Sequence, residues 1–407
     1  MIAAVPYGTI EPWWKAAFAC AVFAICIIAI VECLISRASR IEGGSILLPM
    51  LALTALAFFQ TLSISADPFQ TRFFALQLLA LTAFLALLYR YANTERRVRV
   101  LVYTILGVAV ASAVFGILRQ TAQHQVGFVL PLLRQNQGYG QFINKNHFAY
   151  LMEMAFGLGL GIILGGGVKR DRVLLYVALV LPIWIGLVLA NSRGGILAML
   201  AQVGVAALIV VSASHDREPT AHSIPLKAIL IIVLCAGVLV GTFWVGGDRL
   251  ATNFEAATRE FNTETSNNSE GASRNEIWRA SLKMFAAHPI LGAGLGGYWM
   301  GITAYHDASG LMTPQEAHND YLELLSSAGL VGLAIGVWFG VAVVRRVRTN
   351  LSSDSGFKRA VRLGAVLGLA GVAAHSLVDF GLHIMVNAVV FITLIMLGSQ
   401  NTQIDAK

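Results

Sequence analysis

Long apolar runs separated by short polar connectors dominate this chain. About eleven of these runs approach the ~20 residues that an apolar helix needs to cross the hydrocarbon core of a bilayer. The expected spans are 13–36, 45–65, 73–89, 98–118, 148–166, 173–190, 195–213, 226–245, 326–344, 360–378 and 383–398. The pattern predicts an all-α, polytopic membrane protein with about 11–12 transmembrane helices.

One stretch, residues 246–325, fits neither a span nor a short connector. The expected division is therefore N-terminal transmembrane helices over 1–245, a large helical loop over 246–325, and C-terminal transmembrane helices with a short tail over 326–407. Polar chemistry gathered on one long loop of a membrane protein indicates an active site at the bilayer surface.

The charges refine this picture and give it an orientation. The chain has 407 residues, of which 57% are hydrophobic and 13% charged, and a soluble domain carries about 25% charged residues. The net charge of +7 does not indicate a nucleic-acid partner, because the basic residues lie in short connectors. Alternate connectors hold roughly 18 of the 29 Lys and Arg. This bias predicts that the N-terminus and the long loop face outward and the C-terminus inward; a twelfth span would move the N-terminus inside.

Two helix starts can be predicted within the long loop. Ser273-Arg-Asn-Glu276 has the spacing of a capping box and predicts a surface helix that carries Arg274 and ends at His288-Pro289. Thr313-Pro-Gln-Glu316 predicts a second helix that runs into the next span, with His318 in its first turns. The positive end of this helix dipole favours a neutral imidazole, the form that accepts a proton.

Further polar groups lie in the connectors on the outer side. They are a glycine-rich turn over 291–299 that a ligand can approach closely, Arg193 in Asn-Ser-Arg-Gly-Gly, the group Asn144, Asn146 and His147, and the series His375, Asp379 and His383. An arginine between two apolar runs is costly unless it meets an anion or a water-filled cavity.

Five motifs occur in order from about Gln141 to the end of the chain. They are Asn144-Lys-Asn146-His147-Phe-Ala, Ser192-Arg193-Gly-Gly, Ser273-Arg274-Asn-Glu-Ile-Trp, Gly292-Ala-Gly-Leu-Gly-Gly-Tyr298 and His318-Asn319-Asp-Tyr321-Leu-Glu-Leu-Leu-Ser-Ser-Ala-Gly329. Together they resemble the O-antigen ligase and polymerase superfamily, and the His-Asn-x-x-Leu…Gly signature is the most specific part.

The resemblance implies a GT-C-like glycosyltransferase of the bacterial inner membrane that faces the periplasm and uses a glycan donor on undecaprenyl pyrophosphate. It implies the catalytic residues His318, Arg274 and Arg193. The expected substrate-binding residues are Asn144, Asn146, His147, Tyr298, Asn319 and Tyr321. The inverting stereochemistry is carried over from the ligases of the superfamily.

The chemistry of these residues agrees with such a reaction. The planar fork of arginine suits phosphate oxygens, so Arg193 and Arg274 would neutralise the leaving pyrophosphate. A neutral His318 within reach of the acceptor hydroxyl would activate it. The outer face has no Asp-x-Asp motif, which favours a reaction without a metal or other cofactor.

Simpler interpretations stand beside these. Loop histidines such as His318 are usually structural, Arg274 fits a solvated first-turn residue, and Arg193 fits a side chain that snorkels to the headgroups. Capping explains Asn144, Asn146 and His147 equally well. An interfacial aromatic belt is the default for Tyr298 and Trp299. For His375, Asp379 and His383, a structural hydrogen-bonded cluster is favoured over a metal site.

Several functions share this donor chemistry. Ligation of O-antigen to lipid A–core is favoured, and the alternatives are an O-antigen or exopolysaccharide polymerase and an O-linked protein oligosaccharyltransferase. A transporter of the lipid-linked glycan is an alternative of another class. It would require ionisable residues near the bilayer midplane, whereas the charges here lie at the outer ends of the spans.

Overall fold

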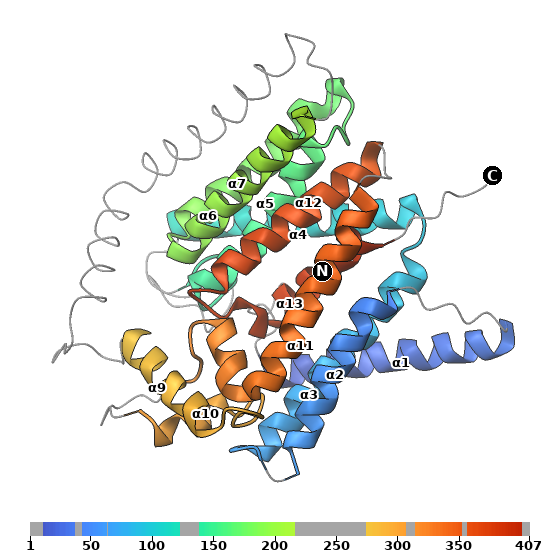
Figure 1. Cartoon of the computed structure of the whole chain (residues 1–407). Helices are drawn as coiled ribbons and strands as arrows, with labels where there is room; N and C mark the ends of the chain where they lie inside the picture. Colours follow the sequence, from blue (N-terminus) through green and yellow to red (C-terminus); the bar gives the residue numbers. More distant parts are fainter. Residues whose placement is uncertain are drawn as a thin grey trace. The chain divides into compact units, whose positions relative to one another are not determined.

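The computed structural model describes residues 11–36, 43–62, 64–122, 138–215, 274–306, 314–351 and 356–400. These ranges form α-helices with short 3₁₀ segments and contain no strand, which confirms the all-α prediction (Figure 1). The α-helices are α1 (Pro12–Ser36), α2 (Gly44–Gln60), α3 (Pro68–Tyr91), α4 (Glu95–Ala122), α5 (Lys145–Leu164), α6 (Val173–Leu189), α7 (Arg193–His215), α9 (Arg274–Ala287), α10 (Tyr298–Gly301), α11 (Asp320–Leu351), α12 (Gly356–His375) and α13 (Met385–Ser399). The 3₁₀ segment η4 covers Gly381–His383.

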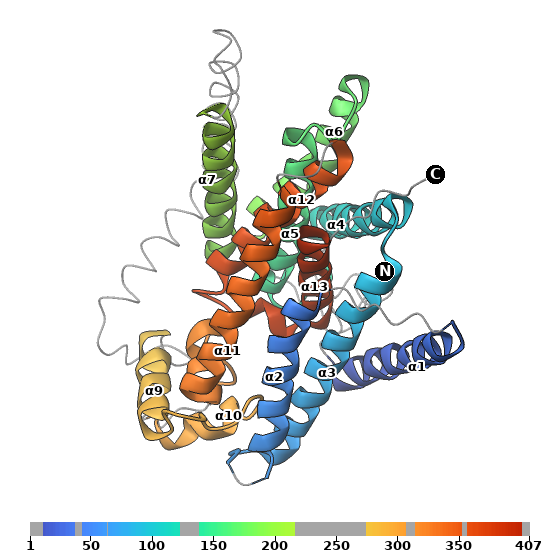
Figure 2. The same cartoon turned by 45° about the vertical axis from the view of Figure 1, so that its right-hand side comes forward.

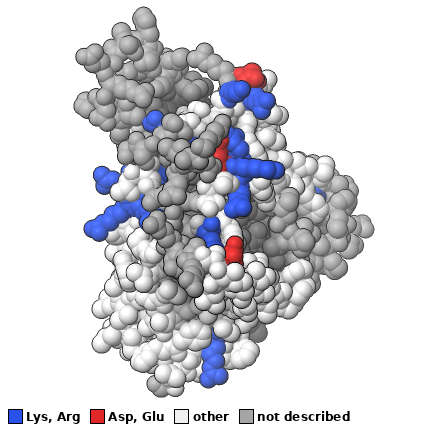
Figure 3. Space-filling view, turned by 90° about the vertical axis from the view of Figure 1, so that its right-hand side faces the viewer, with Lys and Arg blue, Asp and Glu red and all other residues white. Residues whose placement is uncertain are grey.

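The helices match the predicted spans wherever the chain is described. Among the described residues, five helices are long and apolar enough to cross a membrane, namely α1, α3, α4, α5 and α11. Shorter apolar helices coincide with the spans predicted at 45–65, 173–190, 195–213 and 383–398. On the face shown in Figure 3, wide areas carry neither basic nor acidic side chains. A polytopic membrane protein is therefore confirmed, while the expected span 226–245 lies outside the described residues.

The chain forms two compact units, and each combines distant segments. The first contains Met1–Gly8, Val100–Ala256 and Asp354–His375. The second contains Thr9–Arg99, Ala257–Ser353 and Ser376–Lys407. The division of the sequence at residues 246 and 325, which follows membrane topology and not helix packing, stays a prediction.

Glycines determine how the first unit packs. Helices α5 and α12 lie against each other, and both views show them side by side (Figures 1 and 2). A Cβ atom on Gly157 would lie 2.5 Å from the backbone nitrogen of Gly368. One on Gly161 would similarly meet the backbone of Gly364. The two backbones approach this closely because neither helix carries a side chain there, as at small-residue interfaces of membrane helices.

The second unit contains helices α1–α3, α9–α11 and α13. Helix α11 packs against α2 and α9, and α2 packs against α3. Gly329 interrupts α11 with φ 63° and ψ −162°, a left-handed conformation that favours glycine. The amides that follow, Leu330 and Val331, donate to the carbonyls of Pro289 and Ile290 at 2.8 and 3.1 Å. The break in α11 therefore anchors the segment that follows α9.

A buried amide joins three segments of the second unit. Gln60, at the end of α2, donates from Nε2 to the carbonyls of Leu291 and Ser327. Its Oε1 accepts from the backbone of Leu295 at 3.0 Å. The side chain is fully buried, so it replaces hydrogen bonds that these groups would otherwise make with water.

Gln60→Leu is expected to lower the stability of the folded protein by about 2–4 kcal/mol, because it leaves several buried polar groups unsatisfied. A thermal melt of the purified protein in detergent would show the change as a lower melting temperature. Gln120→Leu is the matched control, since Gln120 is exposed at the end of α4. Equal melting temperatures for the two variants would contradict the structural role of Gln60.

Candidate active site

The peptide that precedes His318 is held from both sides. The backbone amide of Ala317 donates to Glu323 Oε2 at 3.0 Å. The carbonyl of Ala317 accepts from Trp278 Nε1 of α9, also at 3.0 Å. Ala317 is completely buried, so His318 projects from a fixed backbone position with its side chain 33% exposed.

The structure corrects the predicted start of the second helix. Helix α11 begins at Asp320 and not at Thr313-Pro314, and Asn319 caps it by accepting from the amide of Leu322 at 3.0 Å. His318 lies just before the helix in the left-handed region, with φ 50°. Thr313 lies outside the described residues, and residues 314–319 are not helical. His318 therefore lies in the loop that precedes α11, and not within the first turns of the helix as predicted.

Asp379 brings the two predicted catalytic residues of this unit together. One carboxylate oxygen of Asp379, Oδ1, lies 3.6 Å from His318 Nδ1. The other, Oδ2, lies 3.7 Å from Arg274 Nη2. The side chain of Asp379 is only 2% exposed, and a buried carboxylate requires compensating charge or hydrogen bonds. The arrangement is a carboxylate that faces an imidazole on one side and a guanidinium on the other.

Helix α9 presents Arg274 at its first described residue, as predicted. Its buried face consists of Ile277, Ala280, Ser281 and Met284. Leu282, on the opposite face, is 51% exposed and stays available for contact with the bilayer surface. The predicted cap Ser273 lies outside the described residues. The helix thus fixes Arg274 through the packing of its apolar face.

Three further residues predicted to bind substrate lie in the same unit. Tyr298 is buried, and its hydroxyl is hydrogen-bonded to Ser281 Oγ at 2.7 Å. Burial raises the pKa of the Tyr298 hydroxyl well above its ordinary value. Asn319 uses its side chain to cap α11, and Tyr321 is 43% exposed. Their contribution to substrate binding stays a prediction.

The glycine-rich turn approaches protein and not open space. Gly292, Gly294 and Gly296 all have positive φ. A Cβ on Gly292 would overlap the backbone of Ser327, and one on Gly294 would overlap Ser65. The turn therefore uses its glycines to lie against α11 and the α2–α3 connection, which the sequence did not predict.

The remaining predicted residues belong to the first unit. Arg193 is half-buried at the first residue of α7, and Ser192 Oγ accepts from the amide of Gly195 at 3.2 Å. Asn144 caps α5 by accepting from the amide of Asn146 at 2.9 Å, and His147 is buried. The geometry thus agrees with the capping interpretation of Asn144. The expected approach of Arg193 to His318 stays a prediction.

The predicted cluster of His375, Asp379 and His383 is wrong in its grouping of His375. That imidazole lies in the first unit, where Nδ1 is 2.7 Å from the buried carboxylate of Glu153. Asp379 instead faces His318 and Arg274, as described above. The four-residue spacing suggested that His375, Asp379 and His383 lie near one turn, but it could not predict which residues each of them contacts.

His383 bridges two carboxylates: that of Glu316, which the sequence assigned to a capping box, and that of Glu323, which the sequence analysis gave no role. Its Nδ1 lies 3.2 Å from Glu316 Oε2, and its Nε2 lies 3.4 Å from Glu323 Oε1. Burial alone lowers the pKa of His383, but the two carboxylates outweigh burial and raise the pKa to about 10. Burial alone would raise the pKa of Glu316, and the charge of His383 lowers it. The three side chains link the loop before α11, α11 itself and η4.

This bridge gives the folded protein a pH-dependent stability. An unfolded histidine titrates near pH ~6.5, so the bridge contributes fully below that pH and its contribution declines as pH rises towards about 10. The melting temperature should therefore fall more steeply between about pH 7 and 10 in the wild type than in His383→Gln. Parallel melting curves across this range would contradict a protonated His383.

Among the described residues, one group has ligand atoms close enough together to bind a metal ion. It consists of Glu316, Glu323 and His383, whose ligand atoms lie within 4.8 Å of one another. Metal ligation requires a neutral imidazole nitrogen that turns its lone pair to the ion. Here both ring nitrogens face carboxylate oxygens. That geometry fits an imidazolium that donates to both carboxylates better than a metal ligand.

The comparison with known families agrees with the helical membrane fold. Residues 176–337 match the family model described as O-Antigen ligase. The matched segment covers less than half of the chain but contains Arg193, Arg274 and His318; it begins after the motif of Asn144 to His147. A search of curated proteins gives no match.

The match confirms the resemblance to the O-antigen ligase superfamily. Fold and match together define the class as a multi-pass membrane protein similar to the O-antigen ligases and polymerases, a superfamily of membrane glycosyltransferases that act on lipid-linked glycans.

Proposed function

We propose that this protein transfers a glycan from undecaprenyl pyrophosphate to an acceptor hydroxyl at the periplasmic face of the inner membrane, as an O-antigen ligase acting on lipid A–core. His318 is the general base, and Arg274 and Arg193 bind the pyrophosphate. The observation that carries this proposal is the approach of His318 and Arg274 to a single buried carboxylate, Asp379. The role of Arg193 rests on the sequence alone.

In the proposed reaction, His318 accepts a proton and arginine stabilises the leaving group. His318 Nδ1 lies 3.6 Å from Asp379 Oδ1, just beyond hydrogen-bond distance. When substrate binding closes this gap, the carboxylate favours the tautomer with the proton on Nδ1, so Nε2 has a lone pair for the acceptor O–H. As Nε2 takes this proton, the acceptor oxygen attacks the anomeric carbon of the donor and the bond from that carbon to the pyrophosphate oxygen breaks. The pyrophosphate leaves as an anion, and arginine neutralises the charge that develops on it.

The glycan profile of a deletion strain tests the proposed acceptor. A ligase predicts loss of all long chains from lipid A–core, with chains that accumulate on the carrier. A single repeat left on the core would instead identify a polymerase. Normal lipopolysaccharide together with an unglycosylated surface protein would identify a protein oligosaccharyltransferase. Movement of a fluorescent lipid-linked sugar across vesicles without glycosyl transfer would reject the enzyme in favour of a transporter.

Arg274→Ala is expected to raise the KM for the lipid-linked donor by about 10-fold or more while the KM for the acceptor changes little. The physical reason is the loss of a charge-assisted contact with the pyrophosphate, worth roughly 1.5–3 kcal/mol. Arg279→Ala is the matched control, because Arg279 lies on the same helix and is exposed. Equal donor KM values in the two variants would contradict the assignment of Arg274.

A further inference from the structure

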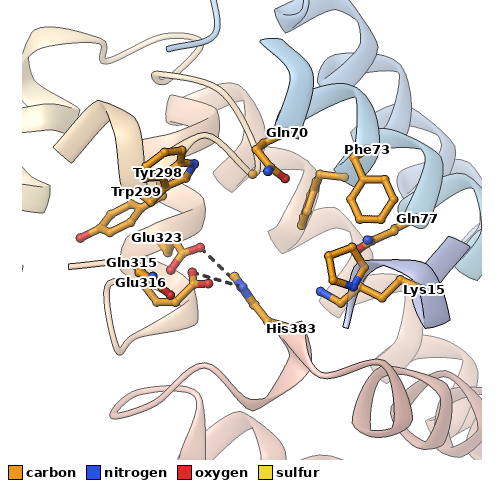
Figure 4. Close-up of a pocket in the computed structure, with 13 residues that line it drawn as sticks. Lys15, Gln70, Phe73, Gln77, Tyr298, Trp299, Gln315, Glu316, Glu323 and His383 are labelled. Atoms are coloured by element: carbon orange, nitrogen blue, oxygen red, sulfur yellow. Dashed lines mark ion pairs between the residues drawn. The ribbon is translucent and has the colours of Figure 1, made fainter. Parts of the chain in front are cut away.

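A cavity lies beside the candidate active site in the second unit. Its volume is about 370 Å³, within the range of small-molecule sites. Figure 4 shows Trp299 and the two carboxylates of Glu316 and Glu323 on one side, and side chains of α3 on the other. Of the residues predicted to bind substrate, Tyr298 lines this cavity, and the cavity itself has no role in the chemistry assigned above.

One wall of the cavity is a polar stripe on an apolar helix. Gln70, Phe73 and Gln77 lie at positions i, i+3 and i+7 of α3 and line the cavity together. Amide side chains on a helix that can cross a membrane are costly unless they find hydrogen-bond partners. Within the described part of the chain, the side-chain amides of Gln70 and Gln77 make no hydrogen bond to protein. Their hydrogen-bonding capacity is therefore directed at whatever fills the cavity.

The charges of the opposite wall indicate which ligand fits. Glu316 and Glu323 place carboxylates there, and both already face the imidazole of His383. Lys15 and His383 also line the cavity, so two basic groups stand against the two carboxylates and the lining has no formal excess of positive charge for a pyrophosphate, unlike the arginine side of the site. Carboxylates and amides together offer the acceptors and donors that neighbouring hydroxyl groups require.

The cavity lining also contains an exposed aromatic side chain. Trp299 lines the cavity and is 39% exposed. Its ring offers a flat apolar surface that matches the C–H face of a pyranose, while its N–H remains available for a hydrogen bond. Amides, carboxylates and an exposed aromatic ring are a combination suited to a polyhydroxylated ring.

The ring of Phe380 lies between the proposed base, His318, and the cavity-lining residue His383. The ring of Phe380 lies 4.8 Å from that of His318, measured between centroids. On its other side, Phe380 lies 5.8 Å from the ring of His383, which lines the cavity. A sugar bound in the cavity would therefore lie next to the sugar whose hydroxyl or anomeric carbon reacts near His318.

We propose that this cavity, between Gln70 and Gln77 on one side and Trp299 and Glu316 on the other, binds a saccharide unit of the glycan substrate. The proposal deepens the proposed function and rests on it for the identity of the substrate. The sugar belongs to either the donor glycan or the acceptor glycan, because both present the same hydroxyl chemistry. Hydrogen bonds from the two glutamines and stacking on Trp299 hold the sugar ring.

An NMR titration of the purified protein in nanodiscs tests this proposal without any transfer reaction. Two soluble probes are used: the oligosaccharide released by mild acid from the strain's own lipid-linked donor, and the core oligosaccharide released from its lipopolysaccharide. We expect one probe to bind the wild type and to bind Gln77→Ala and Trp299→Ala about 10-fold more weakly or worse. The probe that binds identifies the source of the sugar.

Trp338→Ala is the matched control, because Trp338 is also an exposed tryptophan of this unit, on α11 outside the cavity. Binding of neither probe to the wild type, or equal binding by wild type and both cavity variants, would overturn the proposal. So would binding of Mg²⁺ alone that Glu316→Gln abolishes, in a protein that binds neither oligosaccharide. An active His318→Ala variant would reject the proposed chemistry and leave this binding result intact, so the two failures can be distinguished.

Discussion

His318→Ala is expected to lower kcat for glycan transfer by about 10²–10⁴-fold, the usual contribution of a general base. The alanine cannot take the proton of the acceptor hydroxyl, so the attacking oxygen stays a weak nucleophile. Donor binding should change little, because the pyrophosphate is assigned to arginine. Transfer from the lipid-linked donor by the purified variant, with donor and acceptor varied separately, gives both quantities.

His288→Ala is the control for this variant. His288 is an exposed histidine of the same unit, and its ring lies 3.1 Å from the hydroxyl of Tyr305 and not near Asp379. The control should retain wild-type kcat. Full activity of a correctly folded His318→Ala protein would remove the histidine from the mechanism, whatever the control shows.

The sequence predicted elements best where local signals decide the structure. Helix α9 begins at Arg274 and ends at Ala287, next to the predicted stop at His288-Pro289. Proline two residues after a helix cannot continue it, and this signal requires no knowledge of the rest of the chain. The spans were predictable for the same reason, because apolar length alone decides whether a helix can cross the bilayer.

The loop before α11 shows where local signals fail. Thr313-Pro-Gln-Glu316 has the composition of a helix start, yet the helix begins at Asp320. Two long-range contacts compete with the local preference: Trp278 binds the carbonyl of Ala317, and His383 pairs with Glu316. The second contact uses the very side chain that a capping box would require. Tertiary partners therefore set the start of this helix, and sequence spacing does not contain them.

The sequence analysis identified Asp379 as a polar residue of interest but did not predict its contacts with His318 and Arg274. Its spacing of four residues from His375 and His383 suggested one shared cluster, because helical neighbours at this spacing lie on one face. The helix ends at His375, however, so the spacing no longer describes a common face. Asp379 follows the helix and reaches residues distant in sequence, and such pairings depend on how α9, α11 and η4 pack together.

Asp379→Asn is expected to lower kcat by about 10²-fold, within the range reported for groups that orient a catalytic histidine or metal ligand. The amide has nearly the shape of the carboxylate but lacks its charge, so it no longer favours the proton on His318 Nδ1 or attracts the guanidinium of Arg274. Steady-state transfer by the purified variant, with donor and acceptor varied separately, measures this loss.

A double-mutant cycle separates this positioning role from a structural one. If Asp379 acts through His318, then Asp379→Asn should lower kcat by much less in a His318→Ala background than in the wild type, because residues that act as a unit are strongly non-additive. Asp379→Glu, which restores the charge, should recover part of the activity. Equal losses from Asp379→Asn in both backgrounds would contradict the orientation of His318 by Asp379. In that case the buried carboxylate would serve only to hold Arg274 and the fold around it.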